Sequence, residues 1–100
     1  MLIYKIDVSE TASSGAWSFN TPKIANGLLK QIIIKAATAT TTFDVTITDD
    51  KDNIVYFTDT KATGTLRHEV NVPFKGIHTI DVSNSSVDEA FTGKISIQEL

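Results

Sequence analysis

Hydrophobic and polar residues alternate with a period of two along most of this chain. From Leu2 to Val8 the even positions are apolar while Lys5 and Asp7 are polar, which is typical of a strand with one buried face. The same kind of pattern predicts further strands at Trp17–Phe19, Leu28–Ala37, Phe43–Thr48, Ile54–Thr58, Leu66–Val72, His78–Val82 and Phe91–Ile97. No segment keeps apolar residues at helical spacing without competing alternation, so no helix longer than two turns is predicted.

Small and polar residues separate the predicted strands. We expect loops or turns at Thr11–Gly15, Asp49–Asn53, Thr60–Gly64, Pro73–Gly76 and Asn84–Glu89, the second of them a hairpin connection. Gly93 is expected to mark a bulge in the last strand. Eight short strands spaced by turns predict one all-β domain over residues 1–100, an antiparallel two-sheet β-sandwich with jelly-roll-like strand order. An immunoglobulin-like order remains an alternative, because one sequence does not reveal strand order.

Composition agrees with this fold class. The chain has 100 residues, of which seven are Val, twelve Ile and fourteen Thr. These β-branched side chains suit a pleated surface better than a helix. Hydrophobic residues make up 41% and charged residues 21%, which is typical of a globular domain and not of a disordered chain. A chain of this length supports one modest core.

Charge and hydropathy exclude several partners. The net charge is −3, with scattered lysines and the single arginine Arg67, so no nucleic-acid partner is expected. The longest aliphatic run, Ile32–Ile34, is far shorter than the roughly 20 residues that a spanning helix needs, so no membrane partner is expected. Lys5 and Asp7 interrupt the N-terminal apolar stretch, so no export signal is visible. The chain has no cysteine, which excludes disulfides and thiolate chemistry.

Two histidines and one acidic cluster are candidate metal ligands. His68 and His78 could be diagonal neighbours on adjacent strands, but no third ligand shares their face, so we interpret them as ordinary strand residues. Asp49, Asp50 and Asp52 resemble a calcium loop, yet the sixth position is Ile54 where a calcium loop needs glycine. We interpret this cluster as a solvated turn, and no metal or other cofactor is expected.

Motifs for catalysis are absent from the sequence. There is no Gly-x-Ser-x-Gly, no cysteine nucleophile and no glycine-rich phosphate loop, because the five glycines are isolated. No catalytic residue is assigned and no enzyme is expected. Asn84 begins a glycosylation sequon that we interpret as a turn. Trp17, Tyr56 and Phe57 could form a sugar-stacking platform, but the alternation places Trp17 and Phe19 in the core.

Two predicted strands are apolar on both faces, which predicts an interaction surface. If Leu28, Ile32 and Ile34 fill the core, Leu29 and Ile33 lie outside. In the strand after the acidic cluster, either Ile54 and Tyr56 or Val55 and Phe57 are also left outside. The residues assigned to this interface are Leu29, Ile33, Tyr56 and Phe57. A small monomer rarely exposes such a patch, so a second copy or another protein is expected to cover it.

Four segments carry a resemblance to a known group of proteins. They are Gly27–Lys35, Thr42–Asp49, Lys75–Ile80 and Val87–Phe91. Together with their surroundings they resemble small virion-associated proteins of tailed bacteriophages, over nearly the whole chain. The resemblance implies a non-enzymatic structural part of the virion, a capsid decoration or cement protein or a small tail adaptor. It implies the major capsid protein or another virion protein as partner, a homo-oligomer, and location in the virion after synthesis in the host cytoplasm. It carries over no site residue, and a carbohydrate- or receptor-binding module is the alternative.

Overall fold

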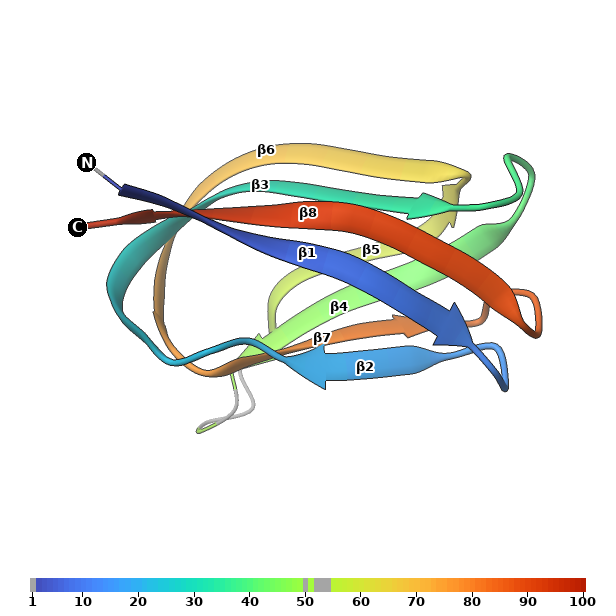
Figure 1. The fold of residues 1–100 in the computed structure, drawn as a ribbon, viewed down its shortest axis with the longest axis horizontal. Coiled ribbons are helices and arrows are strands. Elements are labelled where there is room, and N and C mark those ends of the chain that lie inside the picture. The colour runs from blue at the N-terminus through green and yellow to red at the C-terminus, as the bar shows by residue number, and fades with distance from the viewer. Residues whose placement is uncertain (1, 50, 52–54) are drawn as a thin grey trace.

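The chain folds into two four-stranded antiparallel sheets that pack face to face (Figure 1). The computed structural model describes residues 2–49, 51 and 55–100, with the backbone alone at Leu2 and at residues 56–58. The strands are β1 (Leu2–Ala12), β2 (Trp17–Asn20), β3 (Ile24–Ala36), β4 (Thr42–Asp49), β5 (Val55–Thr63), β6 (Thr65–Gly76), β7 (His78–Ser83) and β8 (Glu89–Glu99). Sheet A has the order β1-β8-β3-β6, and sheet B has the order β2-β7-β4-β5. The predicted all-β sandwich is confirmed.

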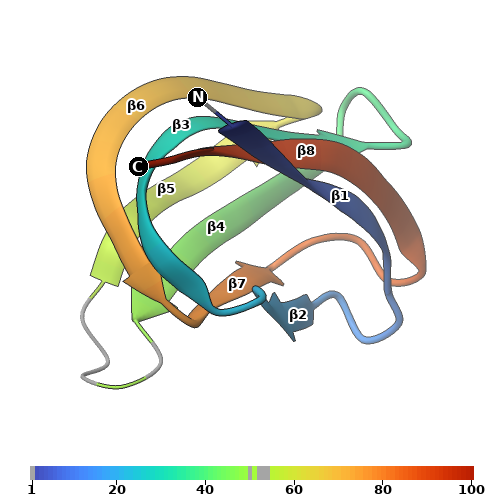
Figure 2. The ribbon, with the colours of Figure 1, turned by 60° about the vertical axis from the view of Figure 1, so that its left-hand side comes forward.

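The strand order is that of an eight-stranded jelly roll. Every pair of consecutive strands except β4 and β5 is divided between the two sheets. The chain therefore crosses repeatedly from one layer to the other, as a jelly roll requires and an immunoglobulin-like sandwich does not. Strands β4 and β5 pair directly, as the hairpin prediction expects. At the end where the termini lie, the start of β3 and the end of β6 bend toward sheet B (Figure 2), and Ile24 pairs with Gly76 there.

The core lies between the inner faces of the two sheets. Trp17 stacks on Phe19 at 5.9 Å between ring centroids and lies 5.7 Å from Phe91, which meets Phe43 edge-on at 5.1 Å. These rings come from β2, β4 and β8, so the aromatic cluster joins sheet A to sheet B. The other buried apolar side chains are Val8, Ala12, Ile24, Leu29, Ile32, Ile34, Ala36, Val45, Ile47, Leu66, Phe74, Ile80, Val82, Ile95 and Ile97. The prediction that Trp17 belongs to the core is confirmed.

Strand β3 contains a bulge that changes which residues face the core. Leu29 pairs with Ile97 of β8 and Gln31 with the next residue, Ser96, so Lys30 is an extra residue against β8. The register with β6 also shifts at this point, where β6 has the additional residue. An extra residue reverses the alternation, and Leu29 is therefore fully buried on the same side as Ile32. The prediction that Leu29 lies outside is wrong, and Leu28 is the half-buried residue instead.

Gly93 does not form the bulge that the sequence suggests. Strand β8 runs through Gly93 in continuous register with β1, opposite Val8, and with β3, opposite Ile34. Its φ is 157°, and a Cβ added there would overlap the carbonyl oxygen of Ile33. The glycine is needed because the β3 backbone approaches closely.

Several strands run further than predicted, into segments that we expected to be loops. β1 continues to Ala12, and β5 continues to Thr63 through Lys61, whose φ is 58°. β6 includes Pro73, which has no amide hydrogen to donate. This proline is tolerated because β6 is at the edge of sheet A, where one side of the strand has no neighbour in the described sheet.

Candidate functional site

The predicted interface residues do not form one apolar patch. Leu29 is fully buried and cannot contact a partner. Ile33 is half-buried on the outer face of sheet A, since Ile32 and Ile34 on either side of it point into the core. Tyr56 and Phe57 lie in β5, but their side chains are outside the described part of the structure. Ile33 is therefore the residue of this set that the structure places at the surface.

Charged side chains surround Ile33 on the outer face of sheet A. Its neighbours on the adjacent strands are Arg67 of β6 and Lys94 of β8, and Lys94 in turn lies opposite Asp7 of β1. The flanking rows add Lys5, Lys35 and Glu69 to the same face. We call the set Lys5, Ile33, Lys35, Arg67 and Lys94 the basic face. Its four cations outnumber the two carboxylates among them, although the chain as a whole has a net charge of −3.

The basic face is open to solvent, with a shallow hollow beside Ile33. The residues that border the hollow include Asp7, Ile33, Lys35, Gly93 and Lys94. In a flanking row of the same face, the side-chain amide of Gln31 donates to the carboxylate of Glu69 at 2.6 Å. An open sheet surface with an apolar residue and surrounding cations can contact a large partner of opposite charge.

The outer face of sheet B has a different chemistry. Its outward positions on β2, β4 and β7 carry hydroxyl, amide and carboxylate groups, namely Ser18, Asn20, Thr42, Asp44, Thr46, Thr48, Thr79, Asp81 and Ser83. The hydroxyl of Thr79 donates to Asn20 at 2.8 Å. The two faces of the sandwich therefore differ in charge, and a cationic surface is concentrated on sheet A.

Asp44 of β4 joins an irregular point of the neighbouring strand β5 to the segment that follows β7. One oxygen of its carboxylate accepts the backbone N–H of Lys61 at 2.9 Å, and the other accepts the side-chain amide of Asn84 at 2.6 Å. Lys61 and Asn84 both have positive φ, near 58° and 56°. These hydrogen bonds, first that from the Lys61 backbone and then that from Asn84, lower the pKa of Asp44 below its ordinary value. The sequence predicts the turn at Asn84 but gives no sign that Asp44 fixes it.

Glu89 and His68 connect other parts of the sandwich. Glu89 is buried, and its carboxylate accepts the backbone N–H of Thr38 at 2.6 Å and the Thr38 hydroxyl at 3.2 Å. This contact fixes the β3–β4 connection against the start of β8. Nε2 of His68 lies 3.0 Å from a carboxylate oxygen of Asp59, which joins the edge strands β6 and β5 of the two sheets.

The residues considered as metal ligands are not brought together. His68 belongs to sheet A and His78 to sheet B, so the idea that they are diagonal neighbours is wrong. His78 is fully buried and stacks on Phe74 with 3.8 Å between ring centroids. Asp49 accepts the backbone N–H of Lys51 at 2.7 Å, which closes a turn, while Asp50 and Asp52 lie outside the described residues. Over the described residues, no group of three or more acidic or histidine side chains could hold a metal ion.

Two further expectations concern sugars and membranes. Trp17 is 8% exposed, so it does not offer a ring face to a sugar, as the core prediction requires. Within residues 2–49, 51 and 55–100, no helix has the length and apolar character to cross a membrane.

Comparison with solved structures shows that the likeness of this chain to known proteins is distant. No family model matches the chain, and no curated protein matches it in sequence. Among solved structures, dimeric latent PorU from Porphyromonas gingivalis resembles it, with a TM-score of 0.46 and 13% sequence identity over 97% of this chain. The chain spans 13% of the length of that PorU chain.

Proposed function

We propose that this protein is a non-enzymatic structural component of a tailed-bacteriophage virion, a decoration protein that binds the capsid lattice. The proposal begins from the resemblance of its strand and turn segments to small phage virion proteins. The basic face is the structural observation that supports the proposal. It offers Ile33 on an inner strand of the four-stranded sheet A, between Arg67 and Lys94.

The basic face replaces the apolar surface that the sequence suggested. Among the predicted interface residues whose side chains the structure describes, Ile33 alone reaches the surface and it is half-buried, so we infer that the cations contribute to recognition. We propose that the partner surface, on the major capsid protein or another virion protein, is acidic. Contacts of this kind are weakened by salt, because exposed charges are screened over about 10 Å at 0.1 M ionic strength.

A repeated lattice compensates for weak single contacts. An exposed ion pair contributes only about 0–1 kcal/mol, so one small interface of this type binds poorly alone. When copies of this protein also contact each other on the lattice, each bound copy raises the effective concentration of the protein at the neighbouring site. Homo-oligomer formation on the particle therefore belongs to the proposal.

Co-sedimentation with capsids that lack this protein, taken from the phage that encodes it, tests the proposed function. The wild type is expected to bind in low salt and to be released as salt rises. Ile33→Glu replaces the apolar centre by a carboxylate and Lys94→Glu reverses a charge, and both variants should fold but fail to bind. Thr42→Glu, an exposed change on the outer face of sheet B, is the matched control and should bind normally. The proposal is refuted if the wild type does not bind, or if both variants on the basic face bind like the control.

A further inference from the structure

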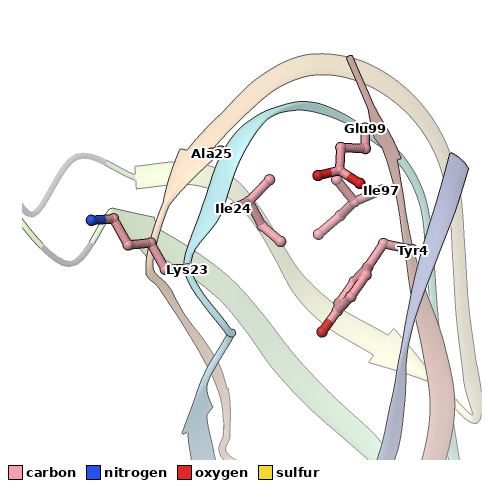
Figure 3. A pocket seen from close by; sticks show the side chains of 6 residues that line it. All are labelled: Tyr4, Lys23, Ile24, Ala25, Ile97 and Glu99. Carbon is pink, nitrogen blue, oxygen red and sulfur yellow. The ribbon is translucent and has the colours of Figure 1, made fainter. Parts of the chain in front are cut away.

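A pocket lies at the end of the sandwich where the two termini meet. It is lined by Tyr4, Lys23, Ile24, Ala25, Ile97 and Glu99 (Figure 3). These residues come from the beginning of β1, the beginning of β3 with the residue before it, and the end of β8. The pocket is separate from the basic face, because Tyr4 is on the inner side of β1 while Lys5 is on the outer side.

The unequal lengths of the strands create this pocket. β1 has 11 residues, while β2 has only four. Tyr4 lies opposite the buried Ile97 and, like Val8, on the inner side of β1. Beyond the end of β2, sheet B no longer covers this side, and Tyr4 is therefore 41% exposed. The chain passing from β2 to β3 forms the opposite wall through Ile24, which is 7% exposed.

The pocket has the size of one six-membered ring. Its volume is about 170 Å³. An engineered apolar cavity of about 150 Å³ in another protein binds benzene, whereas pockets for drug-sized ligands span roughly 300–1,000 Å³. A ligand with one ring fits this space, and a longer chain would have to continue outside it.

The lining combines an apolar base with polar groups at the edge. Ile24, Ile97 and the Tyr4 ring surround a common space, and the Glu99 carboxylate lies beside Ile97 at its rim, as Figure 3 shows. The amine of Lys23 points away from these side chains, so its alkyl chain is what borders the pocket. The carboxylate accepts hydrogen bonds only, and the phenol of Tyr4 can both donate and accept.

We propose that this pocket binds a single neutral pyranose unit, such as the terminal sugar of a glycan. A pyranose ring has an apolar C–H face for Tyr4 and the two isoleucines, and hydroxyls around its edge that can donate to Glu99. A purely apolar ring of the same size would shield the carboxylate from water without giving it a hydrogen bond, which is unfavourable. A one-ring ligand in a site that is open on one side binds weakly, with a Kd on the order of 1 mM. This inference does not depend on the proposed virion role.

Amide chemical-shift mapping tests the pocket directly. The wild-type protein is titrated with the methyl glycosides of glucose, galactose, mannose and N-acetylglucosamine. At least one of them should cause saturable shifts confined to the neighbourhood of Tyr4, Ala25 and Glu99. Tyr4→Ala should abolish these shifts, Glu99→Gln should weaken the affinity about tenfold, and Tyr4→Phe should retain binding because the ring is kept.

Control variants separate loss of the site from loss of the fold. Ile3→Ala changes the neighbouring exposed residue, on the other side of β1, and should leave binding unchanged. Melting curves of the Tyr4 variants establish that they are folded at the temperature of the titration. The proposal is overturned if none of the four sugars shifts these amides, or if Tyr4→Ala binds as the wild type does. It is also overturned if cyclohexanol or a methylated ammonium ion saturates the pocket while the sugars do not.

Discussion

Replacing Gly93 by alanine tests the close approach of β3 and β8. The added Cβ would overlap the carbonyl oxygen of Ile33 and lie 3.1 Å from the Cα of Ile34. Both contacts are backbone atoms of the central pair of strands in sheet A, so no side chain can rotate away to relieve them. The two strands must separate locally or Gly93 must change its backbone angles.

The expected loss of stability follows from these two responses. A residue held in a sparsely populated conformation costs about 1–3 kcal/mol, and a lost ladder hydrogen bond about 1 kcal/mol more. We therefore expect Gly93→Ala to lose roughly 3 kcal/mol, a large part of the 5–15 kcal/mol typical of a domain. For a domain of this size, that loss lowers the Tm by roughly 12–24 °C.

Gly76→Ala provides the matched control. Gly76 also has a positive φ, of 85°, but a Cβ there meets nothing within 4 Å. This variant should lose only the strain of a left-handed residue, about 1–2 kcal/mol. Urea unfolding of both variants, with equal m-values, measures the difference directly. Equal stabilities of the two variants would show that Gly93 is not needed for the approach of β3.

Three other perturbations have defined outcomes. Asp44→Asn should destabilise the protein above about pH 4, and the difference in stability from the wild type should disappear in acid. The reason is that the lowered pKa of Asp44 gives stability that is present above the pKa of the unfolded state and is lost as the pH falls through the pKa of the folded state. A difference in urea midpoint that stays constant across pH would contradict this. Leu29→Ala should lower the free energy of unfolding by about 2–5 kcal/mol because the side chain is fully buried, and Ile33→Ala should lower it clearly less. Equal losses in urea unfolding would contradict the bulge at Lys30. Chelation of divalent metals should leave the melting temperature unchanged, and a fall of several degrees would indicate a bound ion.

The class of fold could be predicted from the sequence because alternation depends on local geometry. A strand with one buried face must place apolar residues at every second position, and Val45 and Ile47 in β4 do this without interruption. The hairpin between β4 and β5 was predictable for the same reason, since a polar cluster separates two such runs. The jelly-roll order is set by long-range pairing, so the sequence could favour it but could not establish it.

The surface could not be predicted to the same extent. One extra residue, Lys30, changes which residues of β3 point into the core. The sequence around Lys30 does not distinguish a bulge from a regular strand. That single shift buries Leu29. The pocket at Tyr4 depends on how far β2 extends beneath β1, which no local pattern encodes. The role of Asp44 likewise depends on two segments, 17 and 40 residues further along the chain, that meet only in the fold.

The pairing of the first strand with the last affects how the chain can fold during its synthesis. β8 lies between β1 and β3, and it is the one neighbour that β1 has in the described sheets. Strand β1 must therefore wait, unpaired, until β8 has left the ribosome. Folds dominated by such distant pairings close slowly, in milliseconds to seconds, because the entropy of ordering a long loop opposes the first contact. During that interval the edge of β1 is open to other chains, and Lys5 and Asp7 within it place charges where an apolar strand would invite aggregation.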